Sequence, residues 1–261
     1  MNKCQTKEDD YLTEASLSDC LGHSELLEAW NKTNTELVNV SGGLETGGGF
    51  AIDKSLLPHL KIEDNETLVL TAAHIVNGAP HTLLGTYDAE GQLQDLYRGQ
   101  VVYSDMATDL AIVKVNISDR NQIPHSINYY DLRQAQTGEE AMVFRPDDEE
   151  RLVGLFKVRC NDTYGAVTDA TLRARHPQIK VSKNTNITLL DRPDQDGTSG
   201  SPLIGKDGKI LGLVSQRITN ARCNNVAENQ SSCAGTVAIS ASQIRLFLKK
   251  ADRELQNTIS K

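Results

Sequence analysis

Short apolar segments that favour β-strands recur along most of this 261-residue chain, and Gly, Asp and Asn residues separate them. Many short strands with turn residues between them are typical of an all-β sandwich or barrel. The segments are 37–40, 49–52, 68–70, 100–103 and 110–113 in the first half, and 141–144, 155–158, 187–190, 210–214 and 236–239 in the second. We therefore expect an all-β fold over residues 37–239.

Two segments outside this array have helical patterns. Residues 240–250 place apolar side chains at helical spacing after Ser240, and serine is a favourable N-cap, so 240–261 is expected to form a C-terminal helix and tail. A second helix is expected around 24–31, within an N-terminal extension, 1–36, that has no strand signal. This extension is interpreted either as a surface-packed or partly mobile leader, or as a pro-segment or partner-binding arm.

Charge and hydropathy exclude several classes of protein. The net charge is −8 and the isoelectric point is near 5.3, which argues against a surface that binds nucleic-acid phosphates. No stretch approaches the length of a membrane span, so no transmembrane segment is expected. Residues 1–20 lack the apolar centre of a signal peptide, so a leader is expected either never to have existed or to be missing from this chain.

The five cysteines are Cys4, Cys20, Cys160, Cys223 and Cys233. None belongs to a C-x-x-C pair and no histidine lies at zinc-ligand spacing, so no metal site is expected. Cys223 and Cys233 flank a polar loop between two strand segments, and we predict that a disulfide closes this loop. Cys20 with Cys160 is a further candidate pair, and Cys4 is a candidate lipid-bearing cysteine of a processed lipoprotein.

Ser199 lies between two glycines in residues 196–202, Asp-Gly-Thr-Ser-Gly-Ser-Pro. Because glycine tolerates φ values that a Cβ forbids, Gly197 and Gly200 allow a turn that presents the serine with amide N–H groups pointing outward. An acyl-transfer site needs such N–H groups beside its nucleophile. Taken alone, the segment is equally consistent with an ordinary turn serine.

A serine hydroxyl becomes a nucleophile when an adjacent base and an orienting carboxylate act on it. His74 is the candidate base, because it follows an apolar run that ends in two alanines. Asp109 is the candidate carboxylate, because it opens a second apolar run, 110–113. Asp105 is the competitor, but no such run follows it directly. Each residue alone also has a simple structural interpretation at the end or start of a strand.

Together these segments resemble those of the chymotrypsin-like (trypsin-like) serine proteases. Residues 71–74, Thr-Ala-Ala-His, are similar to the family's histidine motif, and residues 109–111, Asp-Leu-Ala, to its aspartate motif. Residues 197–202, Gly-Thr-Ser-Gly-Ser-Pro, are similar to its serine motif. The resemblance implies two six-stranded antiparallel β-barrels, at about 37–125 and 135–239, with the active site between them.

The resemblance also implies a role for each residue. Ser199 attacks the scissile carbonyl, His74 takes and returns the proton, and Asp109 holds the histidine tautomer. The backbone N–H groups of Gly197 and Ser199 form the oxyanion hole. No cofactor is implied.

The expected substrate pocket departs from the trypsin branch. Ser215 matches a serine near the buried aspartate, but Gln216 and Arg217 follow it where an aromatic residue and a glycine are usual. Arg217 is interpreted either as narrowing the pocket entrance or meeting an acidic group of the substrate, or as a solvent-facing arginine. Pro193 stands at the position of the pocket aspartate. Asp191 or Asp194 is then the candidate source of a negative charge that favours Lys or Arg at P1.

The residue before the nucleophile is Thr198, where the trypsin branch has an aspartate that pairs with a new N-terminus after zymogen cleavage. Activation by such an ion pair is therefore not expected. The Gly-x-Ser-Gly-Ser-Pro form is more similar to bacterial relatives, including the glutamyl endopeptidase and high-temperature-requirement branches. Val214 stands where the glutamyl branch has a substrate-reading histidine, and no PDZ-like domain follows the expected barrels.

The predicted function is a serine endopeptidase that hydrolyses peptide bonds through an acyl-enzyme. We expect a monomer that acts on protein or peptide substrates, has a protein inhibitor as a candidate partner, and is secreted or periplasmic. The alternative is a catalytically silent chymotrypsin-fold binding protein, although such proteins usually lose a triad residue or a glycine of the nucleophile loop. An esterase of another fold is disfavoured, because it carries Gly-x-Ser-x-Gly and the order Ser, Asp, His.

Overall fold

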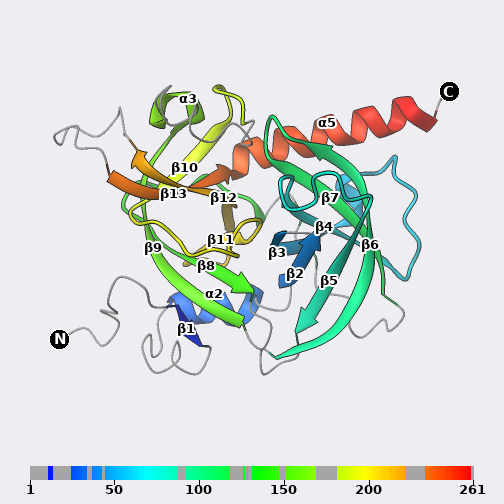
Figure 1. Ribbon diagram of the computed structural model, residues 1–261, viewed down its shortest axis with the longest axis horizontal. Coiled ribbons are helices and arrows are strands. Elements are labelled where there is room, and N and C mark those ends of the chain that lie inside the picture. Colours follow the sequence, from blue (N-terminus) through cyan, green and yellow to red (C-terminus); the bar gives the residue numbers. More distant parts are fainter. Residues whose placement is uncertain are drawn as a thin grey trace.

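The computed structural model contains two β-barrels side by side, with a long C-terminal helix lying across both (Figure 1). The structure describes residues 11–13, 25–33, 37–42, 45–87, 92–117, 126, 128, 131–146, 151–168, 181–221 and 233–259. Within these residues the all-β architecture expected from the strand pattern is confirmed.

The first barrel is closed and antiparallel, with strand order β2-β3-β4-β7-β6-β5. Its strands are β2 (Leu37–Gly42), β3 (Glu45–Ile52), β4 (Glu66–Ala72), β5 (His81–Tyr87), β6 (Leu93–Asp105) and β7 (Leu110–Asn116), with a 3₁₀ turn, η2 (Lys54–Leu56), after β3. Phe50, Leu70 and Ile112 are fully buried in its core. Closure removes the free edges that an open sheet would expose.

The second barrel is a ring of six antiparallel strands in the order β8-β9-β10-β13-β12-β11, closed by pairing of β11 with β8. Its strands are β8 (Glu140–Pro146), β9 (Arg151–Thr163), β10 (Asn186–Leu190), β11 (Pro202–Gly205), β12 (Ile210–Ala221) and β13 (Cys233–Ser240). A two-residue strand, β1 (Leu12–Thr13), adds to β9 from outside the ring.

Three helices accompany the barrels in the described residues: α2 (Glu25–Thr33), α3 (Tyr164–Val167) and α5 (Ala241–Ile259). Helix α2 lies where a helix was expected in the N-terminal extension, and its Trp30 is buried. Helix α5 follows β13 directly, and the hydroxyl of Ser240 accepts a hydrogen bond from the N–H of Gln243 at 3.3 Å, as an N-cap does. The expected C-terminal helix is thereby confirmed.

Helix α5 connects the two barrels. It continues from the last strand of the second barrel and reaches the first, where Lys250 Nζ lies 2.8 Å from Asp105 Oδ2 and Glu254 accepts from the hydroxyl of Tyr103 at 3.0 Å. Phe247 and Leu248, which belong to this helix, are buried. These contacts hold the first barrel against the second and so stabilise the interface at which residues from both barrels meet.

The cysteines are only partly described. Cys160 is buried on β9 and takes part in a disulfide, whose partner lies outside the described side chains. Cys4, Cys20 and Cys223 lie outside the described residues, as does the side chain of Cys233, so the predicted Cys223–Cys233 pair stays a prediction. The described residues include no helix that is long and apolar enough to cross a membrane. They also hold no group of three or more His, Cys, Asp or Glu side chains placed to bind a metal ion.

Candidate active site

His74 lies in the turn that follows β4. Strand β4 pairs with β7, and the N–H of Ala73 donates to the carbonyl of Asp109 at 3.1 Å, so the turn is fixed to the start of β7. Ala73, Ile75 and Val76 are buried on either side of the histidine. The imidazole is therefore placed at the rim of the first barrel by a rigid support.

Asp109 adopts a left-handed backbone conformation with φ of +55°, which is uncommon for a residue other than glycine. Such strained residues cluster at functional sites, where the surrounding structure holds them in place. The side chain is buried, and its carboxylate accepts from the backbone N–H of His74 at 3.0 Å. Both carboxylate oxygens lie 2.9 Å from Nδ1 of His74. Ser215 from β12 donates its hydroxyl to Asp109 Oδ2 at 2.5 Å.

Asp105, the competing carboxylate, contacts other residues. It accepts from the N–H of Ala107 at 2.9 Å and pairs with Lys250 of α5. The structure therefore brings Asp109, and not Asp105, to His74.

Ser199 lies in the loop between β10 and β11, and the loop is fixed to both barrels. The carbonyl of Ser199 accepts from the N–H of Gly48 in β3 at 2.7 Å, and the N–H of Gly200 donates to the carbonyl of Val214 in β12 at 2.7 Å. Gly197 and Gly200 have φ of +92° and +82°, as expected for the turn. Ser199 thus reaches the interface where His74 and Asp109 lie.

The hydroxyl of Ser199 donates to the carbonyl of Ser215 at 3.2 Å. Within the described part of the chain it makes no hydrogen bond to His74. Among the described residues no protein group accepts from the N–H of Gly197 or of Ser199, so both are available to a ligand oxygen. Hydrogen bonds of catalytic groups are often long or misaligned before substrate binds.

Gly47 and Gly48 of β3 also shape the site, although they lie outside the three sequence motifs that resemble the protease family. A Cβ on Gly47 would lie 2.2 Å from the carbonyl oxygen of Ser199, and one on Gly48 would lie 2.0 Å from the hydroxyl of Ser201. Strand β3 therefore passes directly against the nucleophile loop, and only glycine fits at these positions. The signal is the run Gly47-Gly48-Gly49, since glycine inside a strand often marks the close approach of another backbone.

Two opposing effects act on the pKa of His74. Burial favours the neutral imidazole, but the hydrogen bond and negative charge of Asp109 favour the protonated form. Glu45, at the start of β3, adds a second negative charge, with its Oε2 3.9 Å from Nε2 of His74. The net result is that the pKa of His74 is raised above its ordinary value.

The two candidate pocket carboxylates, Asp194 and Asp191, lie in different surroundings. Asp194 is buried beside the nucleophile loop, where Thr198 donates to its carboxylate and its N–H donates to Thr236 of β13 at 2.7 Å. Burial raises the pKa of Asp194, against the opposing effect of these hydroxyl contacts. Asp191 is exposed and accepts from the N–H of Lys157 at 3.0 Å. Of the two candidate carboxylates, only Asp194 therefore contacts the residue that precedes Ser199.

Gln216 and Arg217 continue β12 beyond Ser215. The side chain of Gln216 is buried, and its Nε2 has no hydrogen-bond partner among the described residues. Arg217 is half exposed and contacts Asp196, with its Nη2 3.3 Å from Oδ1. Pro193 is exposed. The structure thus places Arg217 over the loop that precedes Ser199, at the edge of the site.

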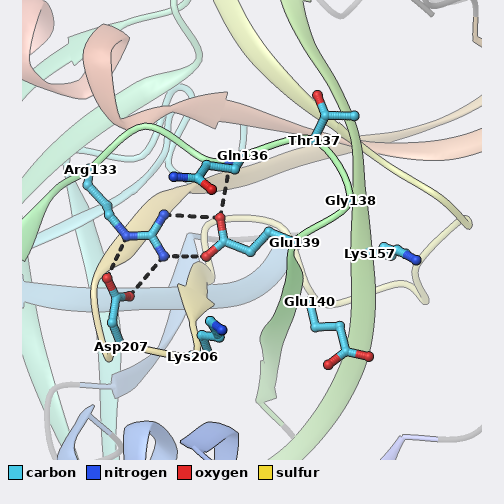
Figure 2. A pocket seen from close by; sticks show the side chains of 9 residues that line it. All are labelled: Arg133, Gln136, Thr137, Gly138, Glu139, Glu140, Lys157, Lys206 and Asp207. Carbon is cyan, nitrogen blue, oxygen red and sulfur yellow. Dashed lines mark hydrogen bonds and ion pairs between the residues drawn. The ribbon is translucent and has the colours of Figure 1, made fainter.

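A cavity of about 730 Å³ lies elsewhere on the second barrel (Figure 2). It is lined by Arg133, Gln136, Thr137, Gly138, Glu139, Glu140, Lys157, Lys206 and Asp207. The guanidinium of Arg133 is held between Glu139 and Asp207, so its charge is already matched within the protein. None of the candidate catalytic residues lines this cavity, and it is not the candidate site.

Comparison with protein families places most of the chain in one known domain. A model of the trypsin-like peptidase domain matches residues 47–213, a span that contains His74, Asp109 and Ser199. The chain is 27% identical to Serine protease Do-like HtrA of Bacillus subtilis over 162 residues, which are 61% of this chain and 32% of that protein. It is 22% identical to Serine protease Do-like HtrB of the same organism over 220 residues, 81% of this chain and 45% of that protein. The chain thus spans less than half the length of these relatives.

Solved structures share the fold at low sequence identity. The Rv3671c protease from M. tuberculosis in its active form superposes with a TM-score of 0.57 at 17% identity, over 85% of this chain and 83% of that chain. The MamO protease domain from Magnetospirillum magneticum gives a TM-score of 0.57 at 16% identity, over 82% and 96% of the two chains. The two-barrel fold implied by the sequence resemblance is therefore confirmed.

Proposed function

Since the chain belongs to the family of trypsin-like peptidase domains, we propose that it is a serine endopeptidase in which His74, Asp109 and Ser199 form the catalytic triad. The observation that carries the proposal is the contact of the Asp109 carboxylate with Nδ1 of His74 at 2.9 Å. This contact fixes the tautomer with the proton on Nδ1, which leaves Nε2 as a base on the side of the barrel interface.

The first chemical step forms an acyl-enzyme. The hydroxyl of Ser199 turns from the carbonyl of Ser215 to Nε2 of His74, gives up its proton there, and its oxygen bonds to the scissile carbonyl carbon. His74 then passes this proton to the leaving amine as the C–N bond breaks. Water attacks the acyl-enzyme by the same route, with His74 again as base, and releases the acid. Asp109 stabilises the imidazolium in each half of the cycle and is itself never protonated.

The N–H groups of Gly197 and Ser199 supply the oxyanion hole in this mechanism. Their availability in the described structure supports the assignment. Preorganised N–H donors stabilise the negative charge that develops on the carbonyl oxygen, and the loss of one such donor typically lowers kcat by about 10²- to 10³-fold. The positive φ of Gly197 agrees with this assignment, because glycine adopts it without the steric cost that a Cβ would add.

We propose a location outside the cytoplasm, secreted or periplasmic. The disulfide at Cys160 supports this, because disulfides persist mainly in oxidising compartments. Proteins and peptides are the proposed substrates, as the names of the related serine proteases suggest.

One experiment tests the enzyme proposal against a silent binding protein. The purified chain and its Ser199→Ala variant are incubated with a fluorophosphonate probe and, separately, with a denatured protein substrate. We expect probe labelling and cleavage by the parent and neither by the variant, and sequencing of the products then gives the P1 residue. The proposal fails if the folded parent neither reacts with the probe nor cleaves.

A further inference from the structure

Tyr11 lies at the end of a short strand that comes from outside the two barrels. Leu12 pairs with Val153 and Thr13 with Leu152, so β1 extends the edge of β9 (Figure 1). Two residues of strand pairing contribute little stability alone, so side-chain contacts must hold the segment in place. Tyr11 makes such contacts.

The ring of Tyr11 fills a space that a glycine leaves open. A Cβ on Gly154 would lie 2.9 Å from Cε1 and 3.0 Å from Cζ of the tyrosine ring. The ring of Phe156 meets it edge-on, with the centroids 6.4 Å apart, and the guanidinium of Arg145 lies over it at 5.6 Å. Edge-to-face and cation–π contacts of this kind are favourable. The tyrosine is therefore docked in a fitted site on the second barrel.

This docking site borders the loop that leads to Ser199. Burial raises the pKa of Tyr11 well above its ordinary value and the negative charge of Asp194 raises it further, while the N–H of Gln195 acts in the opposite direction. Arg145 links the ring to this loop, because its guanidinium lies over the ring and its Nη1 donates to Oε1 of Gln195 at 2.5 Å. The tyrosine hydroxyl is buried and has no hydrogen-bond partner of good geometry among the described residues.

Asp194 and Gln195 in turn hold Thr198. The hydroxyl of Thr198 lies within hydrogen-bond reach of the Asp194 carboxylate and 2.8 Å from the carbonyl of Gln195. Thr198 stands between Gly197 and Ser199, whose N–H groups are the proposed oxyanion hole. A displacement of Gln195 therefore shifts those N–H groups.

We propose that Tyr11 is a positioning residue, which holds the loop 194–198 in the arrangement that presents the N–H groups of Gly197 and Ser199. The inference rests on the proposed function and adds a means of regulating it. The segment before the barrels completes the site, and its withdrawal from the second barrel inactivates the site. The ring carries the contact, since the hydroxyl makes no hydrogen bond of good geometry to any residue that the structure describes.

Kinetics of three variants of the full chain test the role. Tyr11→Ala is expected to lower kcat at least tenfold with a smaller change in KM, because the oxyanion-hole N–H groups act mainly on the transition state. Tyr11→Phe keeps the ring and is expected to retain the parent kcat. Leu12→Ala is the matched control, because alternate side chains of a strand point to opposite faces and Leu12 packs on the core. It removes a side chain of the same strand but leaves the ring contacts of Tyr11 that hold the segment on the barrel, so we expect its kcat to stay unchanged.

A second readout does not depend on catalysis. In the Ser199→Ala background, hydrogen exchange of the amides of 195–199 is expected to be faster with Tyr11→Ala than with Leu12→Ala or with neither change. If the parent cleaves nothing but this exchange difference is found, the proposed function fails while the positioning role stands. If Tyr11→Ala matches the parent in both readouts, or if Leu12→Ala impairs them as strongly, the positioning role is overturned.

Discussion

Alanine at Gly200 is expected to destabilise the protein more than alanine at two other glycines of like conformation. Gly138, Gly197 and Gly200 have φ of +86°, +92° and +82°. A Cβ at Gly138 or Gly197 meets no atom within 4 Å, whereas one at Gly200 lies 2.2 Å from the carbonyl oxygen of Gly48 and 2.5 Å from the hydroxyl of Thr71. The three substitutions therefore share the backbone strain and differ in the steric clash.

The expected magnitudes follow from these two causes. A left-handed conformation costs an L-residue about 1–2 kcal/mol, which is the whole expected effect of Gly138→Ala and Gly197→Ala on the free energy of unfolding. Overpacking adds about 1–3 kcal/mol, so Gly200→Ala is expected to lose about 2–5 kcal/mol. For a chain of this size, each kcal/mol lowers Tm by about 2–4 °C. The clash also pushes the loop away from β3, so we expect Gly200→Ala to lose fluorophosphonate labelling as well.

Thermal unfolding and probe labelling of the three purified variants check this expectation. Gly138→Ala is the control for strain alone, since Gly138 lies in the turn before β8 and does not touch the triad. Equal Tm values for the three variants, with labelling retained in Gly200→Ala, would refute the claim that the nucleophile loop is packed directly against β3.

Two further predictions concern the charge at His74. Asn tolerates the left-handed φ of Asp109, so Asp109→Asn is expected to keep Tm close to the parent value. It should lower kcat by about 10⁴-fold, the loss found for the same change in a serine protease triad, because the wrong histidine tautomer is favoured; an unchanged kcat would contradict the triad assignment. Glu45→Gln removes a negative charge 3.9 Å from Nε2 of His74 and so lowers its pKa. Since the base must be neutral, the acid limb of the pH dependence of kcat/KM is expected to move to lower pH, and an unmoved limb would show that Glu45 does not act on His74.

The choice of Asp109 over Asp105 as the candidate carboxylate can be made from the sequence, because it depends only on the residues that directly follow each aspartate. Asp109 directly precedes the apolar run that becomes β7, so its carboxylate enters the protein at the start of a buried strand. Asp105 ends β6, where Lys250 of α5 is its partner. The helix pattern after Ser240 is equally local. Features set by one strand or one helix can therefore be read from the chain.

Features that depend on two distant segments cannot be read in this way. Strand β1 is too short to give an alternating pattern, and it pairs with residues 152–153, far along the chain. The direction of the Ser199 hydroxyl depends on a single torsion and on the position of the Ser215 carbonyl. The choice between Asp191 and Asp194 follows from which of them accepts the N–H of Lys157. Each of these depends on tertiary packing, which local sequence does not encode.

The contacts of Thr198 bear on the expectation that no activation ion pair forms. An aspartate at position 198 would add a second buried carboxylate next to Asp194 and so would need a cation to offset its charge, whereas the threonine hydroxyl needs only an acceptor. The acceptors here, Asp194 and Gln195, belong to the same loop, so the loop closes on itself without a newly formed N-terminus. What remains is to hold the closed loop on the barrel, and Arg145 does so through Gln195. None of these three contacts involves a newly formed N-terminus, which agrees with the expectation from Thr198, and the proposed contact of Tyr11 acts on the same loop.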